Sequence, residues 1–233
     1  MTVEEILQSQ PVWRASRIAH WLPGIATGFP DLDAALPGQG WPTGDLTEIF
    51  GEAQGIGELE LVLRALAALS ASGKRIVWLA PPHVPYAPAL AAGGVDLAQL
   101  VVLQPQRPRD ALWAAEQVLR SGVIAALVAW LPRLRYIELQ RLALAAEAGR
   151  ALAFLYRPTA TARQCSPAAL RLEVHPGEAE LVVRLLKRRG ASAGAVLRLA
   201  LSSPRHALGR PALPPARARH DRSDRCLGLP VHA

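Results

Sequence analysis

The sequence predicts an α/β protein whose central sheet is mainly parallel and doubly wound, with an antiparallel extension toward the C-terminal end. Two observations predict this fold class. Apolar strand patterns alternate five times with helical patterns across short connections, which is typical of parallel strands joined by right-handed crossovers. Beyond Arg157 the alternation gives way to successive strand patterns separated by glycine and proline turns, which favours β-hairpins.

The elements follow from hydrophobic periodicity, taken in order. We expect a first strand over 46–50, where apolar and polar residues alternate. The rest of the parallel part is then a helix over 58–72, a strand over 75–79, a helix over 87–92, a strand over 100–103, a helix over 108–120 with Pro108 as its first residue, a strand over 125–130, a helix over 137–149 and a strand over 151–156. The antiparallel extension is expected over 169–175, 180–188 and 196–201.

The length and composition fit one folded domain with appendages. The chain has 233 residues, of which 51% are hydrophobic, so material for a core is ample. We expect an N-terminal arm with the segment that leads into the first strand over 1–44, a core domain over 45–203, and a disordered tail over 204–233 that is rich in arginine and proline.

The sequence also indicates a cytoplasmic protein without a metal or a cofactor. No apolar run reaches the roughly 18 residues of a membrane span, and the first ten residues are acidic and amphipathic, unlike a signal peptide. Cys165 and Cys226 lie far apart, with no histidine or cysteine at metal-ligand spacing. Neither a disulfide framework nor a zinc site is therefore expected.

The net charge of +7 is compatible with nucleic acid or another acidic partner. Lys74 and Lys187 are the only lysines, so nearly all of the positive charge is arginine. An alanine- and arginine-rich chain equally fits the composition of a GC-rich genome. Charge alone therefore leaves direct DNA binding open.

A glycine-rich turn between the first strand and the first long helix has the anatomy of a phosphate-binding loop. The segment over 46–63 runs from the alternating strand through Gly51, Gly55 and Gly57 into an amphipathic helix. In a working loop of the pattern G-x-x-x-x-G-K-[ST], backbone N–H groups surround the phosphates, the lysine neutralises them and the hydroxyl binds magnesium. The alternative is a glycine turn unrelated to any nucleotide site.

The residues that carry the chemistry of such a loop are missing. With Gly51 as the first glycine, the second falls on Ile56, the lysine on Gly57 and the serine or threonine on Glu58. A lost charge-assisted hydrogen bond costs about 1.5–3 kcal/mol. A carboxylate about 4 Å from a phosphate charge is repelled by roughly 4 kcal/mol at an effective dielectric near 20. Glu58 instead suits an empty helix N-terminus, so we expect a degenerate loop that holds no phosphate.

Two further groups of residues are candidate contact sites. In the arm, Trp13, Arg14 and Trp21 either pack back on the domain or dock on a partner, because tryptophan and arginine often dominate interfaces. Near the end of the core, the basic cluster consists of Arg184, Lys187, Arg188 and Arg189.

On a regular strand Arg184 and Arg188 would share one face, with Lys187 and Arg189 on the other. The cluster, next to the glycine-containing loop over 190–194, is expected either to contact nucleic-acid phosphates or to form a solvated hairpin end.

Several stretches, taken in order, resemble RecA-type recombinases. They are TGF at 27–29, LPGQGWPTG at 36–44, LTEIFG at 46–51, GKR at 73–75, GVDL at 94–97 and LQP at 103–105. With VWR at 12–14 and LKRRG at 186–190, the chain resembles the ImuA family of RecA-like accessory proteins in bacterial translesion synthesis. The resemblance covers about residues 12–203 and implies a RecA-like P-loop core.

The resemblance also implies further departures from a working ATPase. The glutamate that activates water corresponds to Pro82, and the acidic residue near magnesium corresponds to Trp130. Phosphoryl transfer needs a charge clamp, a metal and an oriented water together. We therefore expect a relative that does not hydrolyse nucleotides and is not an enzyme. His83 as a substitute base is the less favoured hypothesis, since a lone histidine beside two prolines is typical of a loop.

As the family implies, the chain is expected to be a scaffold in damage-induced translesion synthesis. The implied partners are the Y-family-like polymerase ImuB, an error-prone DnaE-type polymerase and RecA, with DNA contact and homo-oligomerisation left open and no membrane contact. Two alternatives are a SulA-type cell-division inhibitor, since that family is another reduced relative of this core, and a weak residual ATPase that uses an arginine from a neighbouring subunit.

Overall fold

The computed structural model describes residues 24–52, 55–178, 180–190 and 194–201, which belong to one compact unit ending at Leu201. The strands are β1 Asp45–Gly51, β2 Arg75–Leu79, β3 Leu100–Leu103, β4 Ile124–Trp130, β5 Leu152–Pro158, β6 Leu170–Pro176, β7 Glu180–Arg188 and β8 Val196–Ala200. The α-helices are α2 Pro30–Ala35, α3 Glu60–Ala71, α4 Ala87–Ala92, α5 Pro108–Arg120 and α6 Tyr136–Gly149, with 3-10 turns η2 Leu97–Gln99 and η3 Thr159–Thr161. Residues 1–23 of the predicted arm and the predicted tail over 204–233 lie outside these residues.

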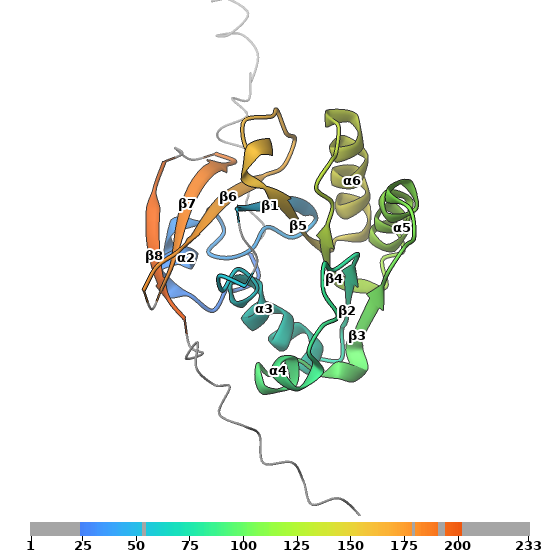
Figure 1. The fold of residues 1–233 in the computed structure, drawn as a ribbon, viewed down its shortest axis with the longest axis horizontal. Coiled ribbons are helices and arrows are strands. Elements are labelled where there is room, and N and C mark those ends of the chain that lie inside the picture. The colour runs from blue at the N-terminus through green and yellow to red at the C-terminus, as the bar shows by residue number, and fades with distance from the viewer. Residues whose placement is uncertain (1–23, 53–54, 179, 191–193, 202–233) are drawn as a thin grey trace, which may run out of the picture. The chain divides into compact units, whose positions relative to one another are not determined.

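The described strands form one sheet in the order β3-β2-β4-β5-β1-β6-β7-β8 (Figure 1). All neighbours from β3 to β6 are parallel, whereas β7 and β8 are antiparallel. The predicted α/β class with an antiparallel C-terminal extension is confirmed. One detail was wrong: β6 was expected in the antiparallel part, but it pairs in parallel with β1 and antiparallel with β7.

Helices cover both faces of the sheet, as a doubly wound fold requires (Figure 1). On one face, Ile49 of β1 and Phe154 of β5 pack with residues of α2, α3 and α4. On the other face, Leu46 and Leu155 pack with α5 and α6. Successive residues of a strand point to opposite faces. Strands covered on both sides are therefore apolar almost throughout, and this pattern made β4 and β5 predictable.

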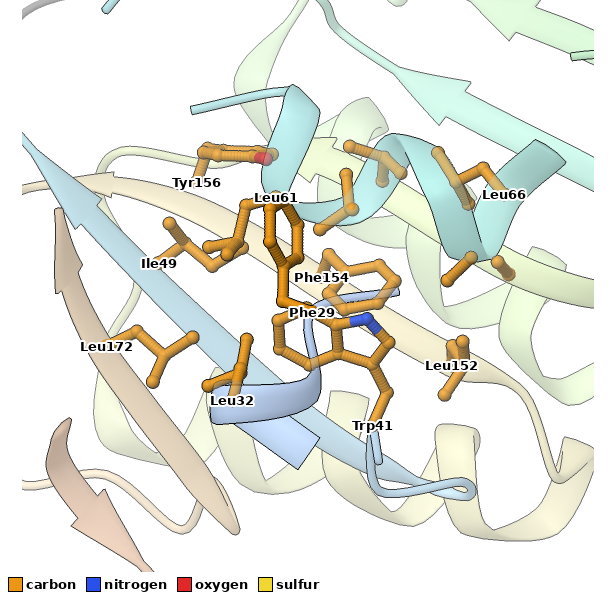
Figure 2. Packing of buried hydrophobic residues seen from close by; sticks show 14 of the residues in the cluster. Phe29, Leu32, Trp41, Ile49, Leu61, Leu66, Leu152, Phe154, Tyr156 and Leu172 are labelled. Atoms are coloured by element: carbon orange, nitrogen blue, oxygen red, sulfur yellow. The ribbon is translucent and has the colours of Figure 1, made fainter. Parts of the chain in front are cut away.

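The segment that leads into β1 belongs to the core. Phe29, Leu32 and Trp41 are buried in the same cluster as Ile49 and Phe154 (Figure 2). The rings of Trp41 and Phe154 meet edge to face, with their centroids 5.1 Å apart. Large aromatic side chains contribute about 3–5 kcal/mol each when buried, so the segment over 24–44 is fixed on the α3 side of the sheet.

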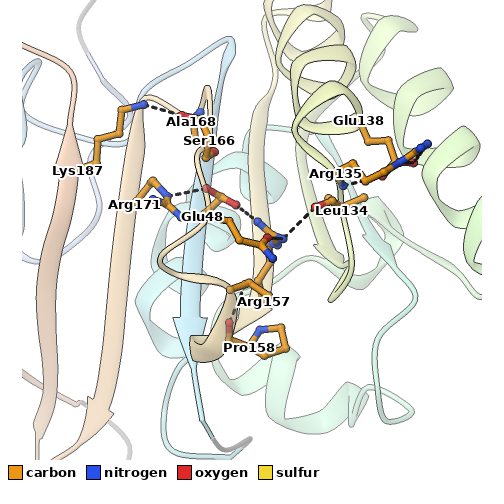
Figure 3. A network of polar contacts seen from close by, with 12 residues as sticks. Glu48, Leu134, Arg135, Glu138, Arg157, Pro158, Ser166, Ala168, Arg171 and Lys187 are labelled. Carbon is orange, nitrogen blue, oxygen red and sulfur yellow. Dashed lines mark hydrogen bonds and ion pairs between the residues drawn. The ribbon is translucent and has the colours of Figure 1, made fainter.

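A buried ion cluster fastens β1, β5 and β6 on the α5–α6 side (Figure 3). The carboxylate of Glu48 accepts a hydrogen bond from Arg157 Nη1, and its other oxygen accepts one from Arg171 Nε at 2.8 Å. The side chains of Glu48 and Arg157 are fully buried. Arg157 also donates to Gln164 Oε1 at 3.1 Å. Sequence analysis did not single out these three residues.

Candidate functional site

A hollow of about 400 Å³ lies at the carboxyl edge of the parallel strands. Residues at or just beyond the ends of β1, β2, β4, β5 and β6 line it: Gly51, Glu52, Glu58, Ala80, Pro82, Trp130, Pro132, Tyr156, Arg157, Pro158 and Val174. In open α/β sheets, ligands bind outside the carboxyl ends of the strands. This hollow is therefore the candidate functional site.

One wall of the hollow contains two stacked aromatic rings. Trp130 lies nearly parallel to Tyr156, with the ring centroids 5.3 Å apart and an interplanar angle of 15°. Trp78, which does not line the hollow, contacts Trp130 edge to face, with the ring centroids 5.5 Å apart and an interplanar angle of 60°. Burial raises the pKa of Tyr156 well above its ordinary value, and the charge of Glu58 adds to this. The wall therefore carries no charge at neutral pH.

The carboxylate of Glu58 occupies the glycine-rich turn from inside. Its Oε1 accepts the Gly55 N–H at 3.0 Å and its Oε2 accepts the Ile56 N–H at 2.9 Å. The Tyr156 hydroxyl donates to the Glu58 carbonyl oxygen at 2.8 Å. Adjacent N–H groups in such a turn are the donors that bind phosphate in a phosphate loop. Here the carboxylate of Glu58 accepts hydrogen bonds from both N–H groups.

The helix that follows begins later than predicted. We expected it at Glu58, but α3 starts at Glu60 and Leu59 is its N-cap residue. Glu58 therefore does not lie at the helix N-terminus as expected, and its side chain turns back into the loop instead. The reason is that two loop N–H groups donate charge-assisted hydrogen bonds to the Glu58 carboxylate, at a position where Glu58 itself is largely buried.

Gly57, where a phosphate loop would have its lysine, has a backbone that suits only glycine. Its φ is +96°, and a Cβ at this position would lie 2.5 Å from Leu201 Cδ1. A left-handed conformation costs an L-residue about 1–2 kcal/mol. Gly55 also has a positive φ, of 75°. The turn is rich in glycine but has Ile56 at the second glycine position of the phosphate-loop pattern, and its assignment as a degenerate phosphate loop stays a prediction.

Two of the positions that the resemblance implied to be altered do meet at the hollow. Pro82 and Trp130 line it together with Gly51 and Glu58, whereas His83 is exposed and does not line it. None of the described residues forms a group of three or more His, Cys, Asp or Glu side chains that could hold a metal ion. The lining residues offer stacking and apolar contact.

The basic cluster is divided between the two faces of the sheet by a bulge. Across β6 and β7, Arg171 is opposite Lys187 and Leu172 is opposite Leu185, which leaves Leu186 as an extra residue. A bulge of this kind reverses the alternation of the side chains beyond it. The expected pairing of Arg184 with Arg188 on one face was therefore wrong. Arg184 shares a face with Lys187.

Each cation of the cluster contacts another part of the protein. Arg184 lies 3.9 Å from Glu173 and Arg189 lies 2.7 Å from Asp45, in both cases between charged atoms. Lys187 Nζ donates to the Ser166 carbonyl at 2.9 Å, and Arg188 donates to the Ala35 carbonyl. Burial, together with the charges of Arg171 and Arg189, lowers the pKa of Lys187. Nucleic-acid contact by this cluster stays a prediction.

The candidate contact residues of the arm, Trp13, Arg14 and Trp21, lie outside the described residues. Sequence reasoning also missed the ion cluster of Glu48, Arg157 and Arg171. The signal that was present is a glutamate in the middle of a strand whose other central residues are all buried and mostly apolar. The partners of Glu48 lie 109 and 123 residues further along the chain. Periodicity alone therefore gave no sign of them.

The fold and the hollow at the strand ends define a RecA-like α/β protein. Residues 15–131, half of the chain, match the RecA N-terminal domain family, and the chain belongs to this family. Its specific resemblance to ImuA stays a prediction.

Two curated relatives match parts of the chain. Protein RecA of Acholeplasma laidlawii is 35% identical over 112 residues, which are 47% of this chain and 33% of that protein. The cell division inhibitor SulA of Edwardsiella piscicida is 37% identical over 82 residues, which are 35% of this chain and 49% of that protein. The chain thus spans a third to a half of the length of these relatives.

Among solved structures, SulA from Pseudomonas aeruginosa is similar with a TM-score of 0.42 and 24% identity, covering 48% of this chain and 97% of that one. Within the described residues, none of the helices is both long enough and apolar enough to cross a membrane.

Proposed function

We propose that this chain is a non-catalytic RecA-like accessory protein of the damage-inducible translesion synthesis machinery, acting in the SOS response through protein contacts and DNA. The observation that carries the non-catalytic part is the contact of the Glu58 carboxylate with the Gly55 and Ile56 N–H groups. The loop already contains an anion, and that anion is covalently part of the protein.

The energy of this contact favours an empty nucleotide site. A bound triphosphate would have to displace the carboxylate from two charge-assisted hydrogen bonds and would then lie beside it. At an effective dielectric near 20, charges about 4 Å apart repel by roughly 4 kcal/mol. Since each 1.4 kcal/mol is tenfold in affinity, nucleotide affinity is lower by about three orders of magnitude than in a loop without Glu58.

Membership of the RecA N-terminal domain family supports a role near recombination and DNA damage. The partners come from the resemblance to ImuA: the Y-family-like polymerase ImuB, an error-prone DnaE-type polymerase and RecA. Without a working nucleotide site, the surfaces of the sheet domain and the arm with Trp13 and Trp21 serve as contact surfaces for these proteins.

The first test is nucleotide binding by the full chain. Calorimetry with ATP and magnesium is expected to detect no binding up to millimolar ATP, and phosphate release is expected to equal the buffer rate. A RecA protein run in parallel provides the positive control. Micromolar affinity or measurable turnover would contradict the proposal and would favour the residual ATPase.

The second test is partner capture with the purified full chain. ImuB and RecA are expected to co-elute with it in size-exclusion chromatography, and exchange of Trp13 and Trp21 for alanine is expected to weaken at least one complex. Retention of neither protein would remove the translesion role while leaving the non-catalytic assignment intact.

A second candidate function has one specific observation in its favour, the 37% identity with a SulA over 82 residues. A cell-division inhibitor of this type acts on the division protein FtsZ, as the resemblance to that family implies. Inhibition of FtsZ polymerisation by the purified chain at stoichiometric concentration would favour it, and undisturbed polymerisation would exclude it.

A further inference from the structure

The opposite, amino edge of the sheet carries a second hollow, of about 640 Å³. It lies where β2 and β4 begin, far from the glycine-rich turn at the other end of the strands. Its lining residues with charged side chains are Lys74, Arg75 and Arg150, and all three are positive. No carboxylate lines this hollow among the residues that the structure describes.

These three cations differ from the other basic residues that we have considered. All three are exposed, and in the described part of the chain none of their side chains forms an ion pair or a hydrogen bond. By contrast, Arg189 is paired with Asp45 and Lys187 is bonded to Ser166. The charges of Lys74, Arg75 and Arg150 are therefore not neutralised by an ion pair with a described residue.

Helix ends explain only part of this positive charge. Helices α3, α5 and α6 end at the hollow, in front of Lys74, Gly122 and Arg150. The C-terminus of a helix carries about −0.5 elementary charge, and cations nearby are favourable. Three helix ends balance about half of three cations, and a net charge of about +1.5 is left for a ligand.

Three of the residues that line the hollow are glycines. Gly73 and Gly122 have positive φ angles of 76° and 67°, and a Cβ at either would meet nothing within 4 Å. At Gly149 a Cβ would lie 1.8 Å from the Leu119 carbonyl oxygen, so the ends of α5 and α6 approach here as closely as a glycine permits. The glycines at 73, 122 and 149 leave part of the lining of the hollow without side chains.

Two of the three cations lie at the amino ends of strands. Arg75 begins β2 and Arg150 precedes β5, and in the strand order two steps separate β2 from β5. At about 4.8 Å per step, these cations extend over about 10 Å, which is enough for about two phosphates of an extended strand.

We propose that the amino edge binds the phosphate backbone of DNA through Lys74, Arg75 and Arg150, independently of base sequence. This inference rests on the proposed function, because it names the site of the DNA contact. The chemistry of the hollow favours nucleic acid over an acidic protein segment. Protein interfaces depend on buried aromatic or apolar anchors, and no aromatic residue lines this hollow. Phosphate contacts need only unpaired cations.

The test uses the full chain and fluorescence anisotropy with a labelled 20-nucleotide single strand and the corresponding duplex, at 50 to 200 mM NaCl. The variant carries Lys74→Gln, Arg75→Gln and Arg150→Gln together. Each lost phosphate contact lowers the slope of log affinity against log salt by about 0.7 for single strands. We therefore expect the slope to fall by about two and the affinity at 50 mM salt to fall at least tenfold.

A matched control removes the same charge from the carboxyl edge through Arg107→Gln, Arg109→Gln and Arg133→Gln, which are also exposed. The control is expected to change the affinity less than threefold, and thermal melting shows whether both variants stay folded. Equal weakening by both variants, or no change in slope for the first, would overturn the proposal. So would an acidic peptide that competes as well as DNA of equal charge. ATP binding and ImuB capture by the same proteins show separately whether the proposed function holds.

Discussion

The two edges of the sheet treat charge in opposite ways. At the carboxyl edge, Glu58 is bonded to the loop N–H groups and the wall consists of Trp130 and Tyr156, so the hollow has little free charge. At the amino edge, Lys74, Arg75 and Arg150 are unpaired among the described residues. The comparison teaches that two hollows of one sheet can differ in charge: aromatic rings and an internally bonded carboxylate line the one at the carboxyl edge, and three unpaired cations line the one at the amino edge.

The largest effect is expected from the ion cluster that fastens the strands between the two edges. Glu48→Gln leaves Arg157 and Arg171 buried without their counter-charge. Breaking a buried ion pair on one side costs about 3–5 kcal/mol, so urea denaturation should show a loss of stability of that size. Glu173→Gln is the control, because its partner Arg184 is exposed, and it should cost less than about 1 kcal/mol. Equal losses would mean that Glu48 is not the fastening residue.

The next effect opens the carboxyl edge. Glu58→Ala frees the N–H groups of Gly55, which is exposed, and of Ile56, which is half-buried, and loss of hydrogen bonds to a charged acceptor costs about 1.5–3 kcal/mol of unfolding free energy. Inorganic phosphate should then protect the variant from thermal unfolding, with a rise in melting temperature that the wild type lacks. Glu52→Ala, which also lines the hollow, should behave like the wild type. A variant that phosphate does not stabilise would contradict the role of Glu58 as an internal anion.

A smaller effect is expected at Gly57. Gly57→Ala places a Cβ at a φ of +96° and 2.5 Å from Leu201 Cδ1, so stability should fall by about 1–2 kcal/mol. The control is Gly73→Ala, because Gly73 has a similar φ of +76° but open space around it. The difference between the two variants gives the cost of the contact with Leu201 apart from the cost of the backbone conformation. If urea denaturation shows the same loss of stability for both variants, the side chain of Leu201 can move away from the new Cβ without a loss of stability.

The smallest effect concerns pH at the amino edge. Burial raises the pKa of Asp45 above 3.8, although the charge of Arg189 opposes this. The folded state therefore binds more protons than the unfolded state just above pH 3.8. The contribution of Asp45 to the stability of the protein accordingly falls as the pH rises through its folded pKa. The stability of Asp45→Asn relative to the wild type, followed between pH 3.5 and 6 by urea denaturation, should rise with pH. A flat or falling difference would mean that burial does not dominate there.

Most of the fold was predictable because local patterns determine it. The strand over 125–130 has side chains that are buried on both faces, and its apolar sequence alone placed β4 within one residue. The helix over 108–120 was equally clear, since Pro108 suits its first position and Gly122 follows it. Strand β6 was assigned to the antiparallel part, because its pairing with β1 is a contact between distant segments.

The candidate site was predictable in position but not in detail. Gly51, Pro82 and Trp130 were singled out from the sequence, and all three line the hollow. The bonds of Glu58 to Gly55 and Ile56 depend on loop angles that no periodicity reports. The bulge at Leu186 exchanged the faces of the basic residues, and a single extra residue in a strand gives little sequence signal.

The conformation of Gly57 restricts which side chains the glycine-rich turn could carry at this position. A lysine at this position would need both a different backbone and a place for the side chain of Leu201. Replacement of Glu58 alone would open the turn to small anions without supplying the missing cation. Binding of a triphosphate in this turn would therefore require changes at Gly57, Leu201 and Glu58 together.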